Sequence, residues 1–208
     1  MDEATLTALN QDLSRSAGEV LEAFFKANPN GVKAWEKFVD DGLPPAFRRN
    51  VTNLNQRSLI DEHASSIANA SSARKGNFGE IGADLDLNAK GYTSLQPRID
   101  GIDSPGHNGI DIVIEKDGKY FIVEGKYTGS SSLNPAEPPN LPRQMSDAWI
   151  TQGTRLADAV GSQSLAVDII NDGYTRVLAK TAPDGTVVYR LIDSDGYVIT
   201  GNAGNWTP

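Results

Sequence analysis

Apolar residues recur at helical spacing through the first 70 residues of the chain. The longest run covers residues 6–25, and shorter runs cover residues 32–39 and 51–70. Stretches rich in Asn, Asp, Gly and Pro separate these runs, as expected between helices. The pattern predicts a helical N-terminal region over residues 1–72, and nothing in this region has the look of a catalytic motif.

Beyond residue 72 the pattern changes to a mixture of helical and strand-like segments. In order, it predicts a helix, a short strand, two hairpin strands, a second helix and three further strands, at residues 73–89, 92–99, 110–115, 120–127, 143–160, 175–180, 187–192 and 197–200. This order is typical of an α+β domain, here over residues 73–208.

An Asp-Gly pair at residues 117–118 separates the strand-like segments 110–115 and 120–127, and such a pair predicts a tight hairpin. A two-residue turn there fixes the register and places Asp111 opposite Glu124. Facing residues of a hairpin share one side of the sheet, with Cβ atoms about 5 Å apart. The sequence therefore predicts two carboxylates side by side on one face of the hairpin.

Two facing carboxylates repel each other, so either a shared proton or a divalent cation must offset the repulsion. Lys126 is two residues beyond Glu124 and falls on the same face. Two acids that hold Mg²⁺ beside a lysine suit metal-assisted hydrolysis of phosphodiesters. The alternative is an exposed strand face on which Lys126 pairs with the acids in solvent.

Composition narrows the chemistry further. The chain has no cysteine and two histidines, His63 and His107, which excludes disulfide scaffolds, thiolate zinc sites, cysteine nucleophiles and multi-histidine metal sites. The net charge of −8 argues against a broad basic surface that binds nucleic acid without a cation. No apolar run is long enough to span a membrane, and the acidic N-terminus does not resemble a signal peptide.

Residues 109–113 (GIDIV) and 123–127 (VEGKY) together resemble the D…ExK signature of the PD-(D/E)xK superfamily of restriction-endonuclease-like nucleases. The segment 76–83 (GNFGEIGA) is similar to the helix that precedes the hairpin in this superfamily and carries Glu80. Gln144, on the predicted helix 143–160, matches a glutamine that often follows the hairpin. The resemblance implies a restriction-endonuclease-like core, a central mixed β-sheet flanked by helices.

The resemblance also implies a role for each matching residue. Asp111 and Glu124 would bind a divalent metal. Mg²⁺ is the expected metal, and Mn²⁺ or Zn²⁺ are alternatives. Glu80 would bind metal or position water, and Lys126 would activate water or stabilise the charge of the transition state. Gln144 would support the site or contact the substrate.

The same segments resemble the nuclease domains at the C-terminus of contact-dependent growth-inhibition proteins and related polymorphic toxins of bacteria. The resemblance implies delivery within a larger secreted or surface protein, action in the cytoplasm of a target cell, and a cognate immunity protein. The substrate would be DNA, with tRNA or other RNA as the alternative. A housekeeping, repair or restriction nuclease and a non-catalytic interaction module remain alternative interpretations.

Several further residues lie around the motif. Ile110 stands where proline is common in the superfamily, and Gly125 lets a backbone or helix approach closely. His107, in a glycine-flanked loop, is a secondary candidate for a metal ligand or general base. Asp84, one turn after Glu80, is expected on a solvated helix face, with a supporting role behind the site as the alternative. The glycines of segment 76–83 are expected to allow tight helix packing.

Overall fold

A computed structural model describes residues 45–105, 109–129, 132–137 and 139–208. The chain divides into two compact units, one up to Asn55 and one from Gln56 to Pro208. The predicted helices at 6–25 and 32–39, and the candidate His107, lie outside the described residues. Most of the N-terminal region, residues 1–44, also lies outside the described residues. The division of the chain at residue 72 therefore stays a prediction.

The helices that precede the sheet are α3 (Pro45–His63), the short 3-10 helix η1 (Ile67–Asn69) and α4 (Ser72–Ala89). The predicted helix 51–70 is therefore wrong at its end, because the α-helix stops at His63. The prediction for α4 is confirmed, and the Ser71 side chain caps its first turn. Ile60 and Ile67 are buried in one apolar cluster with residues of α4.

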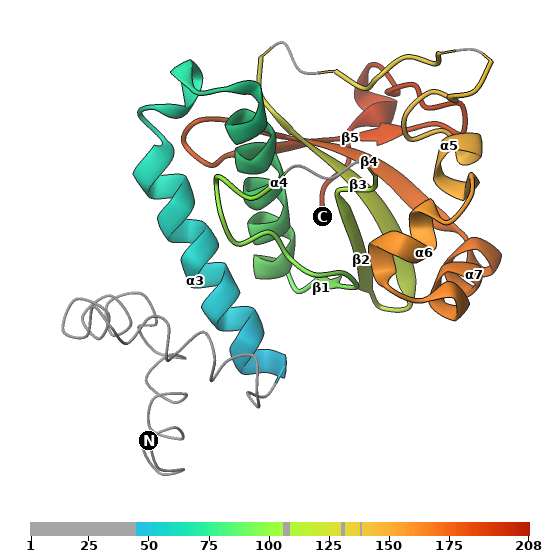
Figure 1. Cartoon of the computed structure of the whole chain (residues 1–208), viewed down its shortest axis with the longest axis horizontal. Helices are drawn as coiled ribbons and strands as arrows, with labels where there is room; N and C mark the ends of the chain where they lie inside the picture. The colour runs from blue at the N-terminus through green and yellow to red at the C-terminus, as the bar shows by residue number, and fades with distance from the viewer. Residues whose placement is uncertain (1–44, 106–108, 130–131, 138) are drawn as a thin grey trace. The chain divides into compact units, whose positions relative to one another are not determined.

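Five strands form a mixed sheet in the order β1-β2-β3-β4-β5 (Figure 1). They are β1 (Thr93–Ser94), β2 (Ile112–Lys116), β3 (Lys119–Tyr127), β4 (Tyr174–Thr181) and β5 (Val187–Ile192). Strands β3 and β4 are parallel, whereas the other neighbours are antiparallel. A parallel pair needs a long crossover connection, and three helices provide it here.

The hairpin register predicted from the Asp-Gly turn is confirmed from Lys116↔Lys119 to Ile112↔Val123. Asp117 and Gly118 both have positive φ, as a tight hairpin turn of this kind requires. The ladder ends one pair earlier than expected, because Asp111 precedes the first residue of β2. Asp111 is still fixed against β3, since its Oδ2 accepts a hydrogen bond of 3.0 Å from the Gly125 backbone N–H.

Strand β1 is much shorter than the predicted strand 92–99, and a side chain explains the difference. Leu95 N–H still bonds to Val113 O (2.9 Å), but next to it the Gln96 side chain replaces the backbone as a partner of β2. Its Nε2 donates to Asp111 O (2.6 Å), and its Oε1 accepts from Val113 N–H. Gln96 therefore braces the backbone on both sides of Ile112.

The predicted single helix over residues 143–160 is wrong. The crossover contains α5 (Asp147–Thr151), α6 (Arg155–Val160) and α7 (Gln163–Asp172). Met145 and Gly153 have positive φ values, which no continuous helix allows. Gln144 consequently lies in a turn before α5 and not on a helix.

The predicted strand 197–200 is reduced to an isolated bridge between Ile192 and Val198. The Asp193 side chain accepts hydrogen bonds from the backbone N–H groups of Asp195 (3.0 Å) and Tyr197 (2.8 Å). A side chain of this kind takes backbone donors away from a ladder and favours a turn. The short 3-10 helix η2 (Asn202–Gly204) follows.

Helices cover both faces of the sheet (Figure 1). Helix α4 packs on the face that includes Ile112, Val123 and Val177. Helices α5–α7 pack on the opposite face, which includes Val113 and Ile122. The predicted α+β class, a mixed sheet flanked by helices, is confirmed. Among the described helices, none combines the length and apolar character needed to cross a lipid bilayer.

Candidate functional site

Glu124 lies in the middle strand of the sheet and its side chain is fully buried. Its Oε1 accepts hydrogen bonds from Lys126 Nζ and from Gln144 Nε2, the latter at 2.7 Å. Its Oε2 is buried and receives no hydrogen bond from any described residue. A buried carboxylate oxygen without a donor is costly, so this atom calls for a partner of positive charge or a proton.

The surroundings of Glu124 favour its protonated form when no cation is bound. Burial raises the pKa of Glu124 well above its usual range, and the charge of Asp111 raises it further. The two carboxyl groups are close enough for a hydrogen bond between them to contribute. Lys126 acts in the opposite direction, but its effect on the pKa of Glu124 is smaller than that of burial.

Lys126 forms an ion pair with Glu124 at one end of β3, and its side chain is 21% exposed. Burial lowers the pKa of Lys126, but the charges of Glu124, Asp111 and Glu80 outweigh burial and raise it. Lys126 is therefore a cation when these carboxylates are ionised. This state suits a group that orients water or stabilises negative charge better than one that removes a proton.

Glu80 reaches the site because α4 lies almost in contact with the backbone of β3. A Cβ atom added at Gly125 would lie 2.7 Å from Glu80 Cα, and one added at Gly79 would lie 2.4 Å from the carbonyl carbon of Lys126. Both distances are shorter than side chains tolerate. The predicted tight packing is thus confirmed at Gly79 and Gly125, and it brings Glu80 to the same end of β3.

Glu80 is itself buried, at 9% exposure. Burial raises the pKa of Glu80 to about 9, with further contributions from the negative charges of Asp111 and Asp84. The neighbouring Lys126 lowers it by a smaller amount. Three carboxyl groups therefore influence one another at this end of the hairpin, and protons or a cation must balance them.

Gln144 connects this group to the loop that follows β3. Its Nε2 donates to Glu124, while its Oε1 accepts from the Asn134 backbone N–H at 3.0 Å. The Gln144 N–H in turn donates to Asn134 O at 3.1 Å. The amide is held in one orientation by these bonds, and it fixes Oε1 of Glu124.

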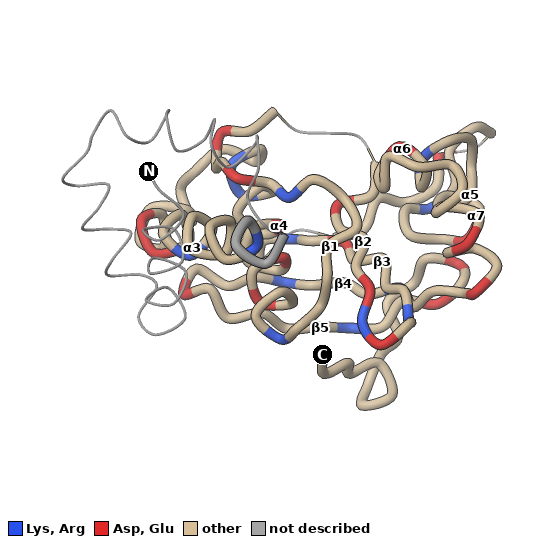
Figure 2. The backbone as a smooth tube through the Cα atoms, turned by 90° about the horizontal axis from the view of Figure 1, so that it is seen from below, with Lys and Arg blue, Asp and Glu red and all other residues tan. Residues whose placement is uncertain are grey.

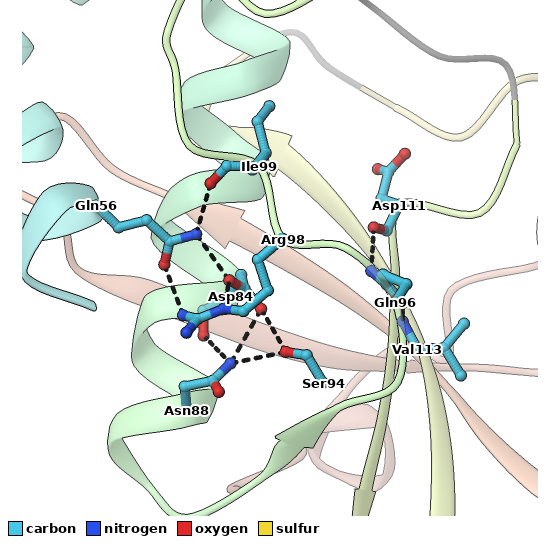
Figure 3. A network of polar contacts seen from close by, with 9 residues as sticks. All are labelled: Gln56, Asp84, Asn88, Ser94, Gln96, Arg98, Ile99, Asp111 and Val113. Carbon is cyan, nitrogen blue, oxygen red and sulfur yellow. Dashed lines mark hydrogen bonds and ion pairs between the residues drawn. The ribbon is translucent and has the colours of Figure 1, made fainter. Parts of the chain in front are cut away.

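A second polar network lies one helical turn beyond Glu80, around Asp84 (Figure 3). Asp84 is 2% exposed and accepts hydrogen bonds from Gln56 (2.7 Å), Arg98 (2.5 Å), Ser94 (2.9 Å) and Asn88 (3.0 Å). The expectation of a solvated helix face at Asp84 is wrong, because the chain that carries Ser94 and Arg98 folds back over this face of α4. The network keeps a negative charge near Glu80.

Sequence reasoning did not identify Gln96 or the partners of Asp84 as parts of the site. Figure 3 shows Gln96 beside the backbone of Asp111, whose carboxyl group points away from it. The spacing of Asp84 and Glu80, one turn apart on α4, was a usable signal for Asp84. No sequence pattern pointed to Gln96, because its side chain bonds to the β2 backbone only where β1 ends after Ser94.

The structure brings together the five candidate residues that lie in its described part: Glu80, Asp111, Glu124, Lys126 and Gln144. No group of three or more His, Asp or Glu side chains within the described ranges has the arrangement of a preformed metal centre. Mg²⁺ is commonly held by one or two carboxylates, with waters and substrate phosphates as the other ligands. The buried Oε2 of Glu124, which receives no hydrogen bond from the described residues and is influenced by the neighbouring Asp111 carboxylate, fits such a cation.

Comparisons with known proteins do not assign the chain to a family. A scan against protein-family models gives no match, and searches of curated proteins and of solved structures find no protein similar to this chain. The chemistry of the site is therefore inferred from its own residues and their geometry.

Proposed function

We propose that this chain is a metal-dependent nuclease that hydrolyses phosphodiester bonds of nucleic acid. One observation carries the proposal: the fully buried Glu124 has an oxygen that no described residue supplies with a donor, close to the charge of Asp111, with Lys126 on the same strand. The placement of Glu80 on a helix packed against this strand supports it. The mixed sheet between helices is compatible with a restriction-endonuclease-like core, which we include in the proposal.

In this proposal Asp111 and Glu124 hold a divalent cation, Mg²⁺ in the first place with Mn²⁺ or Zn²⁺ as alternatives. Such an ion lowers the pKa of a bound water and polarises the phosphate. Glu80 would hold the ion or position the attacking water in its ionised form, after the cation has displaced the proton that its raised pKa retains in the metal-free protein. Lys126, as a cation, stabilises the negative charge that develops on the phosphate.

The biological setting rests on the resemblance of the hairpin and its flanking segments to bacterial toxin nucleases. The chain would act on DNA, or on tRNA or other RNA, in the cytoplasm of a target bacterium. It would arrive as part of a larger secreted or surface protein, and an immunity protein would protect the producing cell. A housekeeping or repair nuclease would use the same site.

Cleavage of plasmid DNA and total tRNA tests the enzymatic part. We expect cleavage with Mg²⁺ and none with EDTA. Lys126→Ala and Glu124→Gln should lower the rate at least about 100-fold, the scale of one lost electrostatic donor or metal ligand. Lys119→Ala, which changes an exposed lysine of the same strand, is the matched control and should cleave like the wild type.

Cleavage that persists in EDTA or in Lys126→Ala would contradict this mechanism. No cleavage of either substrate by the folded wild-type chain would favour the interaction module. A second small protein that binds this chain tightly and stops cleavage is expected of the toxin and not of a repair nuclease.

A further inference from the structure

A cavity of about 480 Å³ opens beside the candidate site. Strands β4 and β5 form its floor, and the turns around Leu133, Arg143 and Tyr197 form its walls. Three of its lining side chains are basic: Arg143, Lys180 and Arg190. The volume is within the range of pockets that hold a small molecule or a nucleotide.

The strand register places this cavity on the same sheet face as the candidate site. Glu124 pairs with Leu178 and Lys126 pairs with Lys180 across the parallel strands. Paired residues of neighbouring strands point to the same face, and the strands are about 4.8 Å apart. The cavity floor at Leu178 and Lys180 is therefore the next row of side chains beyond Glu124 and Lys126.

The cations of the cavity are not neutralised by described acids. Arg190 donates to the neutral acceptors Gly201 O (2.9 Å) and Asn205 Oδ1. Among the described residues, no Asp or Glu forms an ion pair with Lys180, Arg190 or Arg143. Arg176, two residues before Leu178 on β4, differs because it is paired with Asp147.

An aromatic ring completes the cavity wall. Tyr197 is 55% exposed, and the guanidinium of Arg143 lies 4.2 Å from its ring centroid. The turn that carries Tyr197 packs against the turn of Gln144: a Cβ atom added at Gly196 would lie 2.6 Å from Gln144 O. The ring is thus tied to the residue that bonds to Glu124.

We propose that this cavity binds the nucleotide next to the scissile phosphate, with its phosphate at Lys180 and Arg190 and its base against Tyr197. Unpaired cations beside an exposed aromatic ring are the features with which proteins hold single-stranded nucleic acid. A base that lies against Tyr197 is not in a duplex stack. The inference rests on the proposed function and deepens it: the substrate is single-stranded or unpaired at this position.

The test is binding of fluorescein-labelled oligonucleotides to the full chain carrying Glu124→Gln, so that no cleavage interferes. The probes are a short RNA, the DNA of the same sequence, and the DNA duplex. We expect both single strands to bind more tightly than the duplex. Tyr197→Ser should weaken single-strand binding about 5- to 150-fold, the range for one lost stacking partner, and Tyr197→Phe should retain it.

Lys180→Gln should weaken binding of both single strands, whereas the control Lys119→Gln should not. Thermal unfolding of each variant checks that the fold is intact. Equal affinity for duplex and single strands, or Tyr197→Ser and Lys180→Gln proteins that bind like their parent, would overturn the proposal. Unchanged nucleic-acid binding by the Tyr197→Ser and Lys180→Gln proteins is the result expected if an acidic partner protein fills the cavity instead.

The cleavage assay separates this inference from the proposed function. If the wild type cleaves nucleic acid and the Tyr197→Ser and Lys180→Gln proteins cleave at the same rate, the cavity assignment fails and the nuclease stands. If those variants lose single-strand binding but the wild type cleaves nothing, the cavity stands as a nucleic-acid site and the nuclease assignment fails.

Discussion

Glu80, Asp111 and Glu124 bring three carboxyl groups to one end of the hairpin, where Lys126 is the cation that offsets them. Burial makes the charged forms of Glu80 and Glu124 expensive, and each acid raises the cost for the others. In the metal-free protein, protons bound to these carboxyl groups neutralise part of the excess negative charge. A divalent cation would replace those protons, so metal and protons compete for the same oxygens.

The raised pKa of Glu80 makes the stability of the metal-free protein depend on pH. The unfolded chain releases this proton near pH 4.5, whereas the folded protein holds it up to about pH 9. The folded state thus binds more protons in this window, so stability falls as pH rises through it. We expect thermal unfolding in EDTA to shift to lower temperature between these values.

Glu80→Gln should make this part of the curve shallower, because the glutamine has no proton to lose, while the raised pKa of Glu124 still contributes. Glu137→Gln, a change at an exposed glutamate, should leave the curve unchanged. Excess Mg²⁺ should restore stability most strongly at the upper end of the window. A Glu80→Gln protein with the same pH dependence as the wild type would contradict the assignment of this effect to Glu80.

Most of the candidate site could be predicted at the level of single residues. The Asp-Gly turn determined the register, and the register placed Asp111 near Glu124. The hydrogen bond from Gly125 N–H to Asp111 could not be predicted, because it depends on the ladder ending at Ile112. The contact between Gln144 and Glu124 depends on a turn that the helical pattern concealed.

The contact between α4 and β3 is made by glycines. Gly79 and Gly82 of the helix face the sheet, and Thr181 Oγ1 of β4 donates to Gly79 O at 2.9 Å. Gly76, one turn earlier on the helix, has no atom within 4 Å of an added Cβ. A side chain at Gly79 would clash with β3, whereas a side chain at Gly76 would meet open space. The two positions therefore form a matched pair for mutation.

Gly79→Ala should destabilise the protein by at least about 1–3 kcal/mol, since the new methyl group meets the β3 backbone and forces the helix outward. It should also reduce cleavage, because Glu80 moves with the helix. Gly76→Ala should instead stabilise by about 0.5–1 kcal/mol, as alanine does in an open helix position. Urea unfolding measures both, and equal stability of the two variants would contradict the packing described.

Element boundaries were predictable where local chemistry determines them. The helix over 72–89 and the hairpin follow from apolar spacing and from turn residues. The predicted helix 143–160 failed because Met145 adopts a left-handed conformation that a non-glycine residue seldom takes. The predicted strand at 197–200 is reduced to a bridge because the Asp193 side chain accepts the backbone N–H of Tyr197, although Ile199 N–H still donates to Leu191 O at 2.9 Å.

Charge is distributed unevenly over the molecule. The chain carries a net charge of −8, and helices α5–α7 contain the acids Asp147, Asp158, Asp168 and Asp172 (Figure 2). The cavity residues Lys180, Arg190 and Arg143 are basic and lie on the sheet face that these helices also cover. We expect the attraction of a polyanion to be concentrated at this cavity, because the chain as a whole is acidic.

This distribution predicts a shallow salt dependence of nucleic-acid binding. Lys180 and Arg190, the two cations assigned to phosphate, have no acidic partner among the described residues, and they correspond to a slope of about −1.4 in a plot of log affinity against log salt for single strands. Anisotropy titrations of the Glu124→Gln protein with labelled single strands over a series of KCl concentrations measure it. A slope steeper than about −5 would mean that many other surface cations contact phosphates, against the localised attraction inferred here.

The parallel pairing of β3 with β4 determines when the site can be completed as the chain folds. The hairpin joins residues close in sequence and can form early, which brings the acids together. Lys180 and the rest of the cavity floor are added only after the three-helix crossover has docked. We expect a partly folded chain, in which the hairpin has formed but β4 has not yet paired with β3, to bind nucleic acid weakly until the crossover helices have docked.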